Sequence, residues 1–145
     1  MKTGCFVIGL LLLLFLAGCI EQGERKIEKA CFKDTCYALE LAETQAQREK
    51  GLSKRNSLEE GRGMLFIYSD EGIRPFWMKE MLIPLDIVWM DGNGTVVFIS
   101  KNNEPCGQEY CPLIYPNKKA RYVLEINGGE ADRIGLSLGN KMILA

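Results

Sequence analysis

The segment FWMKEMLIPLDIVWMDGNGTVVFIS, residues 76–100, decides the fold because it contains the clearest strand pair of the chain. Two apolar runs, 85–90 and 95–100, flank the sequence DGNG at 91–94. Asp-Gly and Asn-Gly are strong short-range signals for a β-hairpin. We therefore predict two antiparallel strands here, with side chains alternating between the two faces of a sheet.

The rest of the mature chain predicts more strands and little helix. Alternating or continuous apolar patterns predict strands at 37–42, 63–69, 121–127 and 142–145. A short helix is expected over 44–51, because Thr44 and Gln47 fit a capping box and Gly51 fits the position after the last turn. At most one further short helix fits between 128 and 141. The fold class predicted is α+β, a single compact domain with a mainly antiparallel, barrel-like sheet and one or two short helices.

The N-terminus resembles a prokaryotic lipoprotein signal. Lys2 precedes a 13-residue apolar run that ends in LAGC at 16–19. The run is shorter than the roughly 20 apolar residues that a spanning helix needs. The resemblance implies a signal peptide over 1–18, a lipid on Cys19, a tether over 19–27 and a domain over 28–145. An uncleaved helical anchor and a cleavage without lipid are the alternatives, and each places the domain outside the cytoplasm.

Four cysteines remain in the mature domain, and they form two C-x4-C pairs: Cys31 with Cys36, and Cys106 with Cys111. In an oxidising compartment this spacing favours two local disulfides. A single zinc site with four cysteine ligands is the competing interpretation. Cross-pairing also stays open, because four cysteines allow three connectivities.

Composition excludes several classes of function. The chain has no histidine, so it lacks the usual general base and the commonest metal ligand. Without residues 1–18 it carries 19 acidic and 17 basic residues, a net charge of −2. No basic stripe is present, so we expect no nucleic-acid partner. We also predict no cofactor and no metal site.

Four segments together resemble the DUF192 family, also called UPF0127. They are GLSKR at 51–55, GMLF at 63–66, FWMKEMLIPLDIVWMD at 76–91 and VLEINGG at 123–129. The similarity covers about residues 38–143. It implies a compact β-rich fold and no particular activity. Ser53, Glu80 and Met81 depart from the family's usual residues, and the four mature cysteines lie outside its pattern.

Three charged residues, Lys79, Glu80 and Asp86, interrupt the most apolar part of the mature chain. In an extended strand, Asp86 shares a face with Val88 and Met90, so its carboxylate is expected to be partly buried. A buried carboxylate requires a cation or several N–H donors.

Two interpretations of this charge remain open. In the structural one, the carboxylate accepts hydrogen bonds from local backbone N–H groups or forms an ion pair with Lys79, Arg48, Arg55 or Arg62. In the functional one, it is the polar point of a pocket walled by Trp77, Met78 and Trp89. The candidate ligand-binding residues are Arg55, Trp77, Met78, Lys79 and Asp86.

We therefore predict a membrane-tethered, non-catalytic domain that binds a small ligand or an envelope partner. One alternative is a cell-envelope hydrolase that uses carboxylates, although Glu125 is expected on the solvent face of its strand. A second alternative is Cu(I) binding by thioethers, which that ion favours. The methionines in question also suit the filling of a core. They are Met64, Met78, Met81 and Met90.

Overall fold

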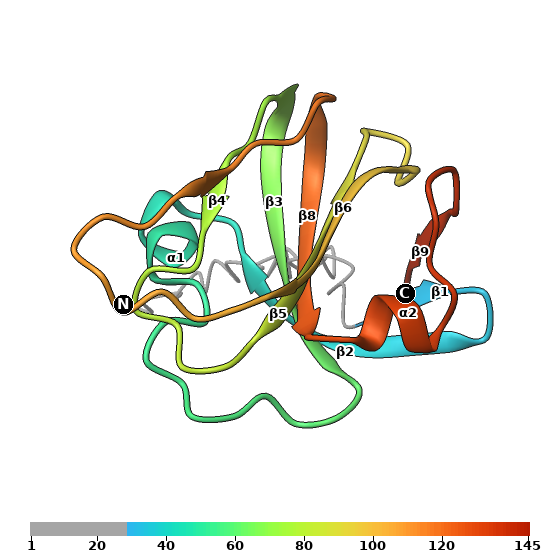
Figure 1. Cartoon of the computed structure of the whole chain (residues 1–145). Coiled ribbons are helices and arrows are strands. Elements are labelled where there is room, and N and C mark those ends of the chain that lie inside the picture. Colours follow the sequence, from blue (N-terminus) through green and yellow to red (C-terminus); the bar gives the residue numbers. More distant parts are fainter. Residues whose placement is uncertain (1–28) are drawn as a thin grey trace, which may run out of the picture.

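The computed structural model describes residues 29–145, which contain nine strands and two short helices (Figure 1). In chain order the elements are β1 (Lys29–Phe32), β2 (Thr35–Ala42), α1 (Gln45–Lys50), β3 (Arg62–Gly72), β4 (Phe76–Trp77), β5 (Leu85–Met90), β6 (Val96–Asn103), β7 (Leu113–Ile114), β8 (Ala120–Asn127), α2 (Glu130–Arg133) and β9 (Met142–Leu144). The signal peptide, Cys19 and the tether predicted above lie outside the described residues.

Seven strands form one curled sheet in the order β6-β5-β8-β3-β2-β1-β9 (Figure 1). Every neighbouring pair is antiparallel except β2 and β3, which run parallel. The two remaining strands, β4 and β7, pair with each other beside this sheet. The α+β class and the mainly antiparallel, barrel-like sheet are confirmed.

The β5–β6 hairpin forms where the Asp-Gly and Asn-Gly signals predicted it. All six residues of β5 are buried, because the strand separates two apolar cores. Val88 lies in the core towards β1, β9 and α2, whereas Ile87 and Trp89 lie in the core towards α1 and β4. The indole N–H of Trp89 donates a hydrogen bond of 2.7 Å to the backbone oxygen of Arg74. Burial on both faces explains why the strand is almost continuously apolar.

Helix α1 has both of the predicted ends. Thr44 caps the first turn, and its side chain accepts a hydrogen bond from the backbone N–H of Gln47 while the Gln47 side chain accepts one from the backbone N–H of Thr44. Gly51 ends the helix with a φ of 48°, in a region that side chains with a Cβ rarely adopt. A Cβ at this position would also lie 3.4 Å from the ring of Phe66. The sharp exit at Gly51 brings the following residues over the sheet.

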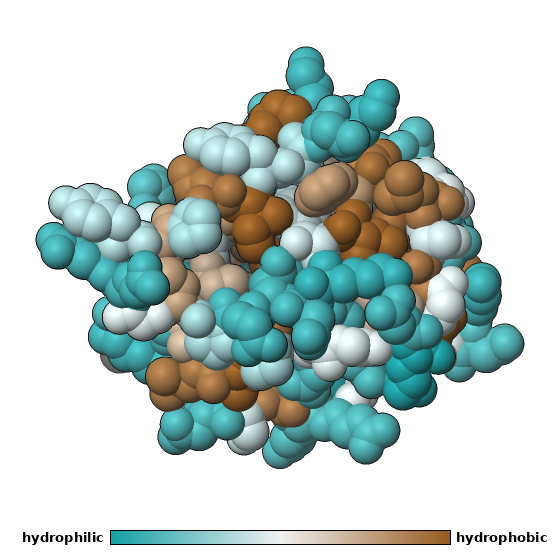
Figure 2. Space-filling model, viewed as in Figure 1, coloured by the Kyte–Doolittle hydropathy of each residue, from teal (hydrophilic) through white to brown (hydrophobic). Residues whose placement is uncertain are grey.

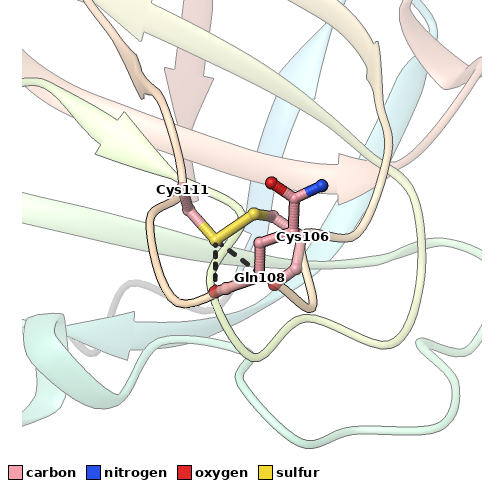
Figure 3. Close-up of a disulfide and its surroundings, with 3 residues drawn as sticks. All are labelled: Cys106, Gln108 and Cys111. Atoms are coloured by element: carbon pink, nitrogen blue, oxygen red, sulfur yellow. Dashed lines mark hydrogen bonds between the residues drawn. A yellow bond between two sulfur atoms is a disulfide. The ribbon is translucent and has the colours of Figure 1, made fainter.

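Two local disulfides join cysteines five positions apart. Both pairs are the local disulfides that the spacing favoured: Cys31–Cys36 closes the β1–β2 hairpin, and Cys106–Cys111 closes a loop before β7. Figure 3 shows the sulfur of Cys111 near two backbone oxygens, those of Cys106 at 3.3 Å and Gln108 at 3.5 Å. A disulfide sulfur has no proton to donate, so these are close polar contacts. The disulfides indicate an oxidising, extracytoplasmic environment.

The segment between β6 and β8 crosses in front of the sheet and is fastened at two points (Figure 1). Near the disulfide, the N–H of Cys106 donates a hydrogen bond of 3.0 Å to the backbone oxygen of Met78. Further along, Leu113 pairs with Trp77 in the β4–β7 ladder. We call residues 104–119 the strap. Between residues 29 and 145, no helix has the length and apolar character needed to cross a bilayer.

Candidate functional site

A cleft of about 250 Å³ opens between α1, β3 and the β4–β7 pair. Apolar and aromatic side chains form most of its wall, and they come from segments far apart in the chain. These residues include Leu52, Phe66, Tyr68, Phe76, Trp77, Met81 and Leu113. The wall therefore exists only when the helix, the long strand β3 and the strap are all in place.

The carboxyl group of Glu125 lines this cleft and is the only buried charged side chain there among the described residues. Glu125 stands on β8 in register with Met64 of β3 and Ile87 of β5, so apolar strands flank it on both sides. Its residue is 4% exposed, and its Oε2 atom has no hydrogen-bond partner in the described part of the protein. Burial away from water raises the pKa of this carboxyl group to about 8.

The prediction that Glu125 faces solvent is wrong. Alternation along β8 does separate Glu125 from Leu124 and Ile126, but both faces of this central strand are covered. Val123 is the signal in the sequence that could have shown this. It shares a face with Glu125 and belongs to the apolar core, so that face could not be a fully solvated one.

Aromatic rings continue from the cleft wall into the core. The ring centroids of Phe66 and Phe76 lie 4.9 Å apart in an edge-to-face arrangement, and those of Phe76 and Trp89 lie 5.7 Å apart. Such pairs are worth about 0.5–1.5 kcal/mol beyond the area that they bury. These ring contacts connect the wall of the cleft to the core behind it.

Tyr68 lies between two guanidinium groups, with its ring centroid 4.9 Å from Cζ of Arg48 and 4.1 Å from Cζ of Arg74. Burial raises the pKa of its hydroxyl group, the two arginines oppose that rise, and the nearby Glu125 adds to it. Arg48 is itself held by hydrogen bonds from Nη1 to the backbone oxygens of Glu43 and Ile67. This side of the cleft is thus both aromatic and positively charged.

Basic side chains dominate the rim. Arg48, Lys50 and Lys79 line the cleft, against the single acidic rim residue Glu49. The Nζ of Lys79 lies 5.5 Å from the centroid of the Trp77 ring. Lys50 and Lys79 form none of the ion pairs found within residues 29–145. Two ammonium groups that form no ion pair within the described residues therefore stand at the cleft.

The structure brings together two of the five residues that the sequence selected. Trp77 and Lys79 line the cleft. Met78 is buried on the other side of the same segment and lines a smaller pocket of about 200 Å³ with Cys106. Arg55 lies away from the cleft and forms a bidentate ion pair with Glu40, with contacts of 2.5 and 2.7 Å.

Asp86 lies on the face of β5 that points away from the cleft. Its carboxylate is fully buried and accepts three backbone N–H groups, from Asn102 at 2.6 Å, Gly129 at 3.1 Å and Ala131 at 2.7 Å. The Asp86 carboxylate forms no ion pair within the described residues, so none of the cations predicted as its partner, Lys79, Arg48, Arg55 or Arg62, pairs with it. The carboxylate fastens β5 to the end of β6 and to the start of α2, which agrees with the structural interpretation of this charge.

The four methionines considered for Cu(I) do not converge on one point. Met64, Met78 and Met81 are buried in the core on the cleft side, and Met90 is buried in the core on the opposite side of the sheet. Residues 29–145 also contain no group of three or more His, Cys, Asp or Glu side chains placed to hold a metal ion. The methionines fill the cores.

Comparison with known proteins gives the family. The family model DUF192, described as an uncharacterized ACR, matches residues 28–144. The chain belongs to this family. No curated protein matches the chain.

Two solved structures share the fold of this DUF192 protein. A protein of unknown function from Novosphingobium aromaticivorans is 34% identical, with a TM-score of 0.70 over 75% of this chain and 76% of that one. A protein from Sinorhizobium meliloti described as a candidate transcription regulator is 29% identical, with a TM-score of 0.73 over 80% of this chain and 90% of that one. The resemblance to DUF192 inferred from the four sequence segments is therefore confirmed, and the family itself carries no assigned activity.

Proposed function

We propose that this DUF192 domain binds a small organic molecule in the cleft above Glu125 without converting it. The observation that carries the proposal is the buried carboxyl group of Glu125, whose Oε2 has no partner within the described residues. Most buried polar groups in folded proteins are hydrogen-bonded, and one left without a partner costs about 1–3 kcal/mol. A buried carboxyl group without a hydrogen-bond partner at the floor of an open cleft is suited to pairing with a bound ligand.

The size and lining of the cleft support a small ligand. Drug-sized molecules occupy pockets of roughly 300–1,000 Å³ lined by apolar side chains and a few polar groups. The cleft has the same kind of lining and a volume of about 250 Å³. A molecule with a compact apolar body and one or two polar groups fits this description.

Hydrolysis is less well supported than binding. Carboxylate-based hydrolysis commonly uses two carboxyl groups that flank the bond to be broken. The cleft contains one buried carboxyl group, and the other acidic residue of its lining, Glu49, is exposed on α1 at the rim. Among the described residues, the cleft therefore offers no second buried carboxyl group for this kind of hydrolysis.

The site of action that we propose is the outer face of a membrane, with the domain held there by a lipid on Cys19. The lipoprotein-like sequence around Cys19 and the two disulfides support this placement. A nucleic-acid partner, which the description of the Sinorhizobium protein would suggest, has less support. The net charge of the chain is −1, and the described helices span six and four residues, too few for a helix that enters a groove.

A thermal-shift screen of the oxidised protein against amino acids, short peptides, sugars and nucleotides tests the proposal. A compound present at about 100 times its dissociation constant adds about 2.7 kcal/mol to the free energy of unfolding and raises the melting temperature. We expect a hit that Glu125→Gln weakens and that Glu60→Gln, a change at an exposed position, leaves intact. A hit that survives Glu125→Gln, Lys79→Gln and Phe76→Ala would place binding outside the cleft and contradict the proposal.

A further inference from the structure

We propose that the ligand is a small zwitterion of the amino-acid type, whose ammonium group enters the cleft to pair with Glu125 while its carboxylate pairs with the lysines of the rim. This inference rests on the proposed function, since it names the chemistry of the molecule that the cleft takes. Three features of the cleft support it: the kind of polar group at the floor, the kind of wall, and the sign of the charge at the entrance.

The group at the floor is a carboxyl group and not an amide. A neutral acid and the side chain of glutamine each combine a hydrogen-bond donor with an acceptor oxygen. Only the carboxyl group can also become negatively charged. A buried carboxylate needs a cation, and Glu125 has none among the described residues. An ammonium group from a ligand supplies both the opposite charge and the missing hydrogen-bond donors.

The wall of the cleft also suits an ammonium group. Phe66 and Phe76 line it, whereas the ring of Tyr68 is already in contact with Arg48 and Arg74. Aromatic faces attract cations at distances up to about 6 Å from the ring centroid, and the attraction is stronger where water is excluded. An aliphatic wall would bury the apolar body of a ligand equally well but would offer nothing to its charge.

The rim opposes a simple amine. Three cationic side chains, Arg48, Lys50 and Lys79, stand against Glu49 at the entrance. Their combined potential disfavours a ligand whose only charge is positive and favours one that also carries a negative group. Because Lys50 and Lys79 lack acidic partners in the part of the chain described, a ligand carboxylate can pair with them without displacing an existing ion pair.

Binding of such a ligand is coupled to the release of a proton. Free Glu125 is a neutral acid at pH 7, since its pKa lies at about 8. When the ammonium group arrives, the O–H bond of the acid breaks, the carboxylate remains beside the ammonium group, and the proton leaves to the buffer. Apart from Glu125, the titratable and charged groups around the cleft are Arg48, Glu49 and Lys50 on the α1 side, Tyr68 on β3, and Lys79.

The test is calorimetry on the full-length oxidised protein with three matched compounds: L-phenylalanine, 3-phenylpropanoate, which lacks the ammonium group, and phenethylamine, which lacks the carboxylate. The other L-amino acids and their matched analogues follow in the same format. Titration at pH 7 in phosphate and in Tris, which differ in ionisation enthalpy, gives the number of protons released. We expect an amino acid to bind with release of about 0.9 proton, and its affinity to rise about tenfold from pH 6 to pH 7.

Variants separate the two ends of the ligand. Glu125→Gln keeps the shape of the side chain and removes the charge, so it should weaken amino-acid binding by about 30-fold or more and abolish proton release. Lys79→Gln should weaken binding by about two- to fivefold, as expected for an exposed pair. Glu60→Gln is the matched control and should change neither quantity. Circular dichroism spectra and melting temperatures establish that each variant is folded before its titration.

The outcomes distinguish this inference from the proposed function. Equal affinity for 3-phenylpropanoate and phenylalanine, or unchanged amino-acid binding in Glu125→Gln, overturns the zwitterion and leaves a cleft that binds small molecules through a neutral acid. If only the sugars, peptides or nucleotides of the thermal-shift screen bind, and no amino acid does, the zwitterion is likewise overturned. A flat response to the amino acids and to every compound of the thermal-shift screen overturns both.

Discussion

Replacing Glu125 with Gln should remove one component of the pH dependence of stability. The pKa of Glu125 is about 8 in the folded protein, against an ordinary value of 4.5. Between these two values the folded protein holds a proton that the unfolded chain has released. The contribution of Glu125 to the free energy of unfolding is therefore fully present below pH 4.5 and is lost as the pH rises to about 8. Each pH unit in that window costs about 1.4 kcal/mol, or about 5 kcal/mol over the whole window.

Urea unfolding of the wild type and of Glu125→Gln at pH 5, 6, 7 and 8, followed by tryptophan fluorescence, measures this component. The glutamine variant cannot titrate, so its stability relative to the wild type should increase by about 2–3 kcal/mol from pH 5 to pH 7. Glu40 and Glu130, whose pKa values are lowered by hydrogen bonds from Arg55 and Arg133, titrate alike in both proteins and cancel in the difference. If the free energy of unfolding depends on pH equally in the two proteins, Glu125 is not a buried neutral acid. That result would contradict the proposed binding in the cleft.

Three further predictions concern residues outside the cleft floor. Asp86→Asn should lower the free energy of unfolding by about 2–3 kcal/mol, because a charged acceptor of three backbone N–H groups is lost. Calorimetry should show unchanged ligand affinity, whereas unchanged stability with weaker binding would place Asp86 in the binding site. Replacing Cys106 and Cys111 with serine should lower the free energy of unfolding by about 2 kcal/mol and speed amide hydrogen exchange within the strap. Exchange as slow as in the wild type would show that the disulfide does not hold the strap in place. Met78→Leu should change the free energy of unfolding by less than about 1.5 kcal/mol and should not alter titrations with Cu(I) against a chromogenic chelator. A stoichiometric Cu(I) complex that forms with the wild type and is lost in this variant would favour the copper alternative.

Local signals in the sequence predicted the local elements. The β5–β6 hairpin follows from a turn whose residues are fixed by their own backbone preferences, and α1 follows from a capping box and a terminal glycine. The order of strands in the sheet depends instead on contacts between distant segments. The parallel pairing of β2 with β3 and the insertion of β8 between β3 and β5 could not be predicted, because no short motif records which strands meet.

The same distinction explains the outcome at the site. Asp86 was selected because it interrupts an apolar run, and it is indeed buried, but its partners come from backbone N–H groups up to 45 positions away. The alternation of Glu125 with apolar residues predicts a solvent-facing side chain, yet the residue is buried. Alternation identifies which residues share a face of a strand, and it does not say whether a helix or a strap covers that face. Only the assembled fold shows that the face of β8 with Val123 and Glu125 is enclosed.

The pairing of β1 with β9 sets a condition on how the protein folds. Ala30 stands opposite Leu144, and Phe32 opposite Met142, so one strand pair joins the two ends of the described chain (Figure 1). Figure 2 shows several apolar patches among hydrophilic side chains on this face. Met142 of β9 is buried in the same core as Ala30 and Phe32 of β1, so the terminal strand helps to complete that core. Contacts between residues so distant in the chain slow folding, because the long loop must close before they form. The β1–β2 hairpin can form early within its disulfide, but its outer edge stays open until β9 arrives, and that edge is where a folding chain is most exposed to pairing with another copy.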